Sequence, residues 1–207
     1  MNAIDSSVIA DKTAPRSKMP LLVMAVILLP MVVAYIIFHT GWGFPTTTTN
    51  KGTLLTPAIS VQDFDVDGTT PLAFMSDVGN KRWRLLVPVP SSCDSACQKN
   101  MYTTRQVHVR LAEKAYRVER VFALFEAPSV KQQQNFASQH PNARLVTVPP
   151  ILFSQWLGTD AIARDNVDQH YYLVDQEGFV MMSYTANHSG QDLLDDIKKL
   201  LKFTYDN

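Results

Sequence analysis

The two cysteines of this chain, Cys93 and Cys97, are the residues whose type and spacing best suit chemistry. They follow an apolar run at residues 85–89 and begin a segment with helical periodicity. Residues i and i+4 of a helix are neighbours, which brings their Cα atoms within the roughly 4.4–6.8 Å that a disulfide requires. Two thiolates at this spacing can equally share a soft cation such as Cu(I). The pair therefore predicts either thiol–disulfide chemistry or binding of a soft metal.

A reactive pair is a better interpretation than a purely structural bridge, because a disulfide stabilises less when the loop that it closes is short. We expect Ser92 to cap the helix, so that Cys93 lies in the first turn, where the helix dipole stabilises a thiolate. The neighbouring charge of Asp94 opposes that stabilisation. By analogy with other dithiol pairs, we expect Cys93 to be the exposed attacking sulfur and Cys97 the resolving sulfur.

A membrane anchor precedes these elements. Residues 21–38 carry no charge and are interrupted only by Pro30; as a helix they span about 27 Å, close to the roughly 30 Å of a bilayer core. The run exceeds the apolar region of a signal peptide, and no small-x-small cleavage site follows it, so we expect an uncleaved anchor. Basic residues flank only its N-terminal side, which predicts a cytoplasmic N-terminus and an exported C-terminal domain.

The expected domain organisation follows from these features. It consists of a cytoplasmic tail at residues 1–19, a transmembrane helix at 20–39, a Gly/Thr/Pro-rich linker at 40–57 and a folded domain at 58–207. The domain is long enough to bury a core without disulfides. The chain has 19 basic and 19 acidic residues, so its composition offers no electrostatic argument for a nucleic-acid partner.

Hydrophobic periodicity predicts an alternating α/β order in this domain. The expected elements are a hairpin of strands 72–75 and 83–89, a helix from the cysteines to about 115, strand 118–125, helix 131–139, strand 144–148, helix 151–157, a hairpin of strands 171–174 and 179–184, and helix 191–203 capped by Ser189. This is the order of a thioredoxin-like fold with an extra N-terminal β-hairpin.

An acidic motif precedes the first of these hairpins. Asp63-x-Asp65-x-Asp67-Gly68 copies the start of an EF-hand loop, but Phe74 stands at its twelfth position, where the calcium-binding Glu belongs. We therefore expect a turn before a strand here, not a calcium site.

Several stretches resemble the Sco/SenC group: residues 83–88, the Cys93-x-x-x-Cys97 motif, residues 172–178 with their Asp-x-x-Gly turn, and the last helix. Residues 50–57 and 105–108 are also similar to small single-span proteins that accompany cytochrome oxidase genes in gammaproteobacteria. Members of the Sco/SenC group are membrane-anchored thioredoxin-like proteins of cytochrome c oxidase assembly. The resemblance covers nearly the whole chain.

The resemblance implies a single-pass inner-membrane protein with a periplasmic domain. It would act on the copper-bearing subunit of the oxidase, or on another assembly factor, by thiol–disulfide exchange or Cu(I) handling at Cys93 and Cys97. The chain departs from the group at Gln98, where a proline usually follows the second cysteine, and at Val167, where the copper-binding histidine is expected. His170 lies three positions later and is the candidate third copper ligand. The rival interpretation is a non-enzymatic assembly factor that uses the fold only for docking.

Overall fold

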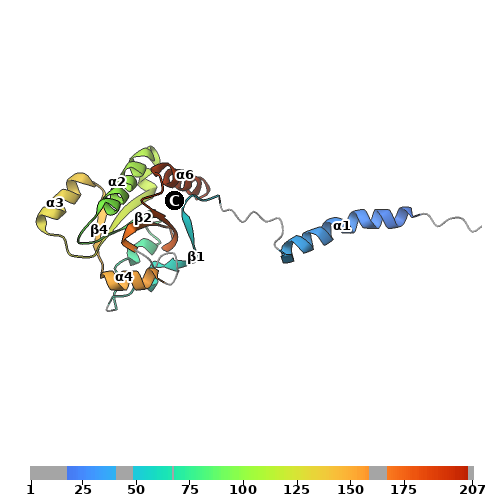
Figure 1. The fold of residues 1–207 in the computed structure, drawn as a ribbon, viewed down its shortest axis with the longest axis horizontal. Helices are drawn as coiled ribbons and strands as arrows, with labels where there is room; N and C mark the ends of the chain where they lie inside the picture. Colours follow the sequence, from blue (N-terminus) through green and yellow to red (C-terminus); the bar gives the residue numbers. More distant parts are fainter. Residues whose placement is uncertain (1–17, 41–48, 67, 159–166, 205–207) are drawn as a thin grey trace, which may run out of the picture. The chain divides into compact units, whose positions relative to one another are not determined.

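The computed structural model describes residues 18–40, 49–66, 68–158 and 167–204, which form two separate compact units (Figure 1). Helix α1 (Met19–Thr40) belongs to the first unit. Its segment Leu22–Thr40 is long and apolar enough to cross a membrane. Pro30 lies inside the helix, as transmembrane helices tolerate. The apolar N-terminal helix predicted from the sequence is thus confirmed.

The second unit is built on a mixed sheet with the strand order β1-β6-β5-β2-β3-β4. Strands β2, β3 and β4 are parallel, whereas β5 pairs antiparallel with β2, β6 with β5, and β1 with β6. Every residue of β2 is buried, as expected for a central strand covered on both faces. The bounds of the strands are β1 Thr53–Ser60, β2 Trp83–Val89, β3 Val118–Leu124, β4 Ala143–Thr147, β5 His170–Val174 and β6 Phe179–Thr185.

Helices cover both faces of this sheet. Helices α2 and α6 pack against each other on one side, and α4 lies on the other side (Figure 1). Ser189 and Asp192 form a capping box at the start of α6, which confirms the predicted cap and explains where the helix begins. The helical bounds are α2 Ser95–Arg110, α3 Val130–Gln139, α4 Pro150–Leu157 and α6 Gly190–Phe203; the short 3-10 helices are η1 Val61–Asp63, η2 Ala73–Ser76, η3 Ala112–Arg117 and η4 Val167–Gln169.

The two faces of the sheet form two hydrophobic cores. The first core, under α2 and α6, includes Cys97, Met101, Leu194 and Ile197. The second core, under α4 and the η1–η2 segment, is formed by residues such as Val61, Phe64, Leu72, Met75, Phe153 and Trp156. The cysteines and α4 therefore lie on opposite sides of the sheet.

The predicted N-terminal hairpin is wrong in its first strand, because residues 73–76 form η2. Leu72 and Met75 are both buried and lie three residues apart, which suits one turn of a 3-10 helix and not the alternation of a strand. The buried guanidinium of Arg84 donates hydrogen bonds to the carbonyls of Phe74 and Met75 and to those of Asn80 and Arg82. These contacts occupy backbone acceptors that a strand partner would need.

The extra N-terminal strand is instead β1, which begins at Thr53, inside the segment that the sequence assigns to a linker. The compact unit itself begins at Thr49. Residues 41–48 of the expected linker lie outside the described residues. The remaining strands and helices of the domain are confirmed, although α2 ends at Arg110 and the last predicted turns of that helix form η3.

Candidate functional site

The two cysteines lie where the chain turns from the buried central strand β2 into helix α2. They form a disulfide whose Cα atoms are 5.3 Å apart. Cys97 is 1% exposed and packs in the first core, whereas Cys93 is half-buried at its margin. The structure therefore joins the predicted pair and leaves Cys93 as the more accessible sulfur.

Asp94, and not Ser92, is the N-cap of α2. Its backbone is extended, and its Oδ1 accepts a hydrogen bond of 2.8 Å from the backbone N–H of Cys97. Aspartate caps helices as well as serine does, and its negative charge also suits the positive end of the helix dipole. As a correction to the sequence analysis, Cys93 thus precedes the helix, while Cys97 lies in its first turn. The capping carboxylate thus occupies the backbone N–H of Cys97.

Gln98, in the first turns of α2, makes two hydrogen bonds to the segment between the cysteines. Its side-chain amide donates to the carbonyl of Cys93 at 3.3 Å, and its backbone N–H donates to the carbonyl of Asp94 at 3.0 Å. A proline, which the Sco pattern places here, has no N–H for the second bond and no amide for the first. The departure at Gln98 therefore adds local contacts that hold Cys93 against the start of α2.

Asn100, one turn after Cys97, ties the cysteine helix to the segment before β5. The residue is 1% exposed, and its Nδ2 donates to the carbonyl of Gln169 at 2.9 Å. Gln169 ends η4, which contacts both β2 and α2, so this segment lies beside the elements that carry the cysteines. The sequence gives no periodic signal for such a bond, because a buried asparagine on a helical face looks like any other polar residue.

His170, the predicted third ligand, is the first residue of β5. It is half-buried, and its ring stacks on Tyr172 with centroids 6.3 Å apart. Val167 packs against the second core and, as an aliphatic residue, offers no ligand. Burial, followed by the charge of Asp168, raises the pKa of Tyr172, so its hydroxyl stays protonated and donates to the carbonyl of Val167 at 3.4 Å.

This disulfide-bonded form does not gather a metal site from those residues. Within the described ranges, no three His, Cys, Asp or Glu side chains are arranged to hold a metal ion. The two sulfurs are bonded to each other, and neither is a thiolate. Because a soft metal is bound by thiolates, these sulfurs can act as ligands only after the disulfide is reduced.

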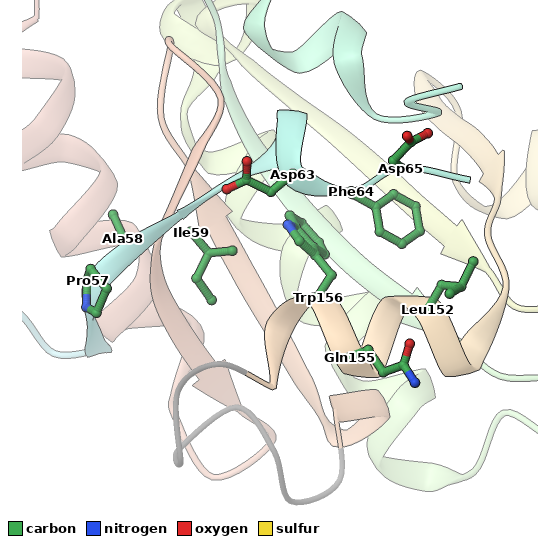
Figure 2. A pocket seen from close by; sticks show the side chains of 9 residues that line it. All are labelled: Pro57, Ala58, Ile59, Asp63, Phe64, Asp65, Leu152, Gln155 and Trp156. Carbon is green, nitrogen blue, oxygen red and sulfur yellow. The ribbon is translucent and has the colours of Figure 1, made fainter. Parts of the chain in front are cut away.

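A cavity that the sequence analysis did not foresee lies on the opposite face of the sheet (Figure 2). It is lined by Ile59 and the Asp63–Asp65 stretch on one side and by Trp156 of α4 on another. The acidic motif that resembles an EF-hand loop thus contributes two of its aspartates to a cavity wall. The run of acidic residues is visible in the sequence, but their spacing does not predict which apolar residues line the cavity beside them.

The strand order and the position of the cysteines at the end of the central strand define a thioredoxin-like protein. The sequence profile of the family described as "Transmembrane-like, thioredoxin-like, C-terminal domain" matches residues 83–204, and the chain belongs to this family. A search of curated proteins found no match.

The solved structure of yeast Sco1 supports the same fold, and two further solved structures show weaker similarity. Yeast Sco1 with copper bound is 13% identical, with a TM-score of 0.51 over 78% of this chain and 97% of that chain. A SCO1/SenC family lipoprotein from Bacillus anthracis is 18% identical, with a TM-score of 0.46 over 59% of this chain and 83% of that one. A thiol:disulfide interchange protein from Bacteroides sp. is 15% identical, with a TM-score of 0.46 over 75% and 92%. The predicted thioredoxin-like fold is confirmed.

Proposed function

We propose that this chain is a membrane-anchored thiol–disulfide exchange protein whose domain acts on the periplasmic side of the inner membrane in cytochrome c oxidase biogenesis. The observation that carries the proposal is the disulfide between an accessible Cys93 and a buried Cys97 at the end of the central strand. An accessible sulfur backed by a buried one suits attack by, and release of, a partner cysteine. The narrower relation to small single-span proteins of gammaproteobacterial oxidase gene clusters is part of the same proposal.

The exchange has two steps when the chain acts as a reductant. The Cys93 thiolate attacks one sulfur of a partner disulfide, which forms a mixed disulfide and releases a partner thiolate. The Cys97 thiolate then attacks the Cys93 sulfur and releases the second partner thiolate. The partner gains two electrons and the chain loses two, which leaves the Cys93–Cys97 disulfide seen here. The reverse sequence oxidises a partner dithiol.

The partner with suitable chemistry is a protein that must hold two cysteines reduced before it binds copper. The copper-bearing subunit of the oxidase, or an assembly factor that serves it, meets this description. The similarity of the fold to yeast Sco1, whose structure holds copper, supports this choice without fixing it.

A trapping experiment tests the exchange. Cys97→Ser should accumulate a mixed disulfide through Cys93, because no resolving thiol remains, and Cys93→Ser is the matched control that should trap nothing. The reduction potential of the wild-type pair separates this proposal from its rival. Structural bridges usually lie below about −300 mV. A potential in that range together with no trapped species would leave the non-enzymatic docking role in its place.

Delivery of Cu(I) by the reduced chain is the second candidate function, with copper as cargo. The two thiolates of Cys93 and Cys97 would supply two ligands, and His170, on the strand next to β2, is the candidate third ligand. Because Val167 stands where the family's histidine is expected, we expect modest affinity. Titration of the reduced chain with Cu(I) against a competing chelator measures it. Tight one-to-one binding that is lost in His170→Ala would show that His170 has assumed the role.

A further inference from the structure

The cavity on the second core has the dimensions of a binding site. Its volume is about 510 Å³, within the roughly 300–1,000 Å³ typical of pockets that hold small ligands. It lies between the C-terminal half of β1, the Asp63–Asp65 stretch and helix α4 (Figure 2). Because Cys97 packs in the first core, a group bound here would be separated from the disulfide by the sheet.

The apolar side of the cavity is held rigidly by its neighbours. Ile59, Phe64 and Trp156 are all buried. The indole N–H of Trp156 donates to the carbonyl of Ser60 at 2.7 Å, and its ring packs at 5.2 Å from that of Phe64 and at 5.6 Å from that of Phe153. A fixed aromatic surface needs little reorganisation on binding, and it suits an apolar stem or a planar cation.

The rim of the cavity is acidic. Asp63 and Asp65 are exposed, and they flank Phe64 along the chain (Figure 2). In the part of the chain that the structure describes, neither carboxylate makes a hydrogen bond or an ion pair, and none of the described lining residues is basic. The cavity therefore offers an apolar, aromatic floor flanked by two carboxylates that have no basic partner among the described residues.

The edge strand that borders the cavity is poorly suited to accept another strand. The pairing of β1 with β6 shifts register between Leu54 and Ile59, and Pro57 lies within that interval. Proline has no N–H to donate, and irregular edges discourage strand addition. A partner would therefore enter the cavity with a side chain, and not by extending the sheet.

We propose that this cavity, defined by Ile59, Asp63, Phe64, Asp65 and Trp156, is a docking site for an arginine side chain of a partner protein. The aliphatic stem would pack on the aromatic floor, and the guanidinium would be attracted by the two exposed carboxylates. Arginine fits better than lysine because its planar, delocalised cation both stacks on aromatic rings and binds carboxylates through several N–H groups. The proposal does not depend on the redox function, because it uses the other face of the sheet.

Titration of the full-length chain in detergent micelles with N-acetyl-arginine amide tests this site, with N-acetyl-citrulline amide as the neutral, nearly isosteric probe. The NMR signal of the Trp156 indole, assigned with Trp156→Phe, reports occupancy. We expect a saturable shift with the arginine probe and about fivefold weaker binding of the citrulline probe, the effect of an exposed charge pair. Asp63→Asn combined with Asp65→Asn should weaken the arginine probe by a similar factor.

Glu113→Gln combined with Glu177→Gln is the matched control, since it removes two exposed charges outside the cavity and should leave binding unchanged. Equal binding of both probes, no effect of the aspartate substitutions or no saturable shift would overturn the proposal. Dimerisation that the same two substitutions abolish would show that a second copy of the chain, and not another protein, is the occupant. The Asp63/Asp65 variant should still exchange its disulfide with a small-molecule dithiol, which keeps this test separate from that of the redox function.

Discussion

Asp94 has two opposed effects on the cysteine pair. It caps α2 through the N–H of Cys97, which stabilises the helix that carries the resolving sulfur. Its charge also lies next to Cys93, where it disfavours a thiolate. The first effect acts on the helix, whereas the second acts only when the disulfide is reduced. The residue therefore favours the disulfide over the dithiol.

Asp94→Asn should separate these effects, because asparagine keeps the capping oxygen and removes the charge. Two charges about 4 Å apart in water interact by about 1 kcal/mol, which corresponds to about 20 mV for a two-electron couple. We expect the reduction potential of Asp94→Asn to rise by about this amount, measured by equilibration with a glutathione buffer. Asp94→Ser should raise the potential in the same way, since it also keeps a capping oxygen without the charge. An unchanged or lower potential in both variants would contradict the assigned role of the charge.

His108, on the C-terminal half of α2, gives the domain a dependence on pH. Its Nε2 lies 2.9 Å from the carbonyl of Val118, which can only accept, so this nitrogen carries the proton in the neutral ring. Burial, followed by the charge of Arg120, lowers the pKa of His108. His140 is shifted in the same direction, first by burial and then by the charges of Arg120 and Arg105.

Because the folded pKa of His108 lies below the unfolded value of about 6.5, the unfolded chain binds more protons over the interval between them. The free energy of unfolding should therefore fall as the pH is lowered from 7.5 towards 5.5. His108→Gln, whose amide can still donate to Val118, should reduce this slope in urea titrations. Comparison at pH 8, where the ring is neutral in both states, isolates any loss of packing. An identical slope in the variant would refute the assignment.

At the scale of elements, hydrogen bonds to Asp196 hold the start of the folded domain, at Lys51 and Gly52, against α6. The buried carboxylate of Asp196 accepts hydrogen bonds from the backbone N–H groups of Lys51 and Gly52 and from the hydroxyl of Tyr184 at 3.0 Å. Burial, followed by the charge of Asp196, raises the pKa of Tyr184, so the phenol remains a donor. Residues 51–52 are thereby fixed just before β1 begins.

Gly52→Ala should displace residues 51–52 from Asp196 and lower the stability of the domain, because an added Cβ would lie 2.5 Å from the ring of Tyr184. That ring is buried and stacked on Tyr171, so it cannot move aside easily. Overpacking of this kind typically costs about 1–3 kcal/mol, which chemical denaturation would measure. Gly79→Ala is the matched control, since its Cβ would meet only the Asp77 carboxylate at ordinary contact distance. Equal stability of the two variants would contradict the close packing of residues 51–52 against Asp196 and Tyr184.

The sequence predicted most elements of the domain because their periodicity is strong. Strand β3 and helix α6 show buried and amphipathic patterns that have one interpretation each. The sequence places the start of strand β1 in the linker, because its Thr- and Pro-containing stretch resembles a tether and its pairing with β6 is long-range. The 72–75 segment is apolar enough for a strand, but the contacts of Arg84 with its carbonyls depend on tertiary structure.

The sequence predicts those features of the candidate site that depend on local spacing, and not those that depend on tertiary contacts. The spacing of Cys93 and Cys97 predicts that their Cα atoms are close enough for a disulfide or for a shared soft metal, and the structure shows the disulfide. The choice of Asp94 over Ser92 as the N-cap could not be made, because both residue types cap helices well and lie two positions apart. The Asn100–Gln169 bond joins residues that only the folded sheet brings together.

At the scale of the whole molecule, we expect the fold to be independent of the disulfide that is central to its proposed function. Two cores on opposite faces of the sheet hold the domain together, and only one of them contains a cysteine. The disulfide closes a loop between residues four positions apart. For so short a loop the chain-entropy contribution is only about 2 kcal/mol. A domain typically has a stability of about 5–15 kcal/mol, so the fold should survive its loss.

The double variant Cys93→Ser/Cys97→Ser should therefore remain folded and accumulate at the membrane while failing to support oxidase assembly. Circular dichroism and urea denaturation would measure the fold, and oxidase activity in cells that carry only the variant would measure the function. Val107→Ala is a useful comparison, because it removes buried apolar volume from the first core without touching the sulfurs. It should lower stability by a comparable amount and leave oxidase assembly intact. If the double cysteine variant supported assembly fully, the exchange reaction would be excluded as the function of this protein, and docking through its surfaces would take its place.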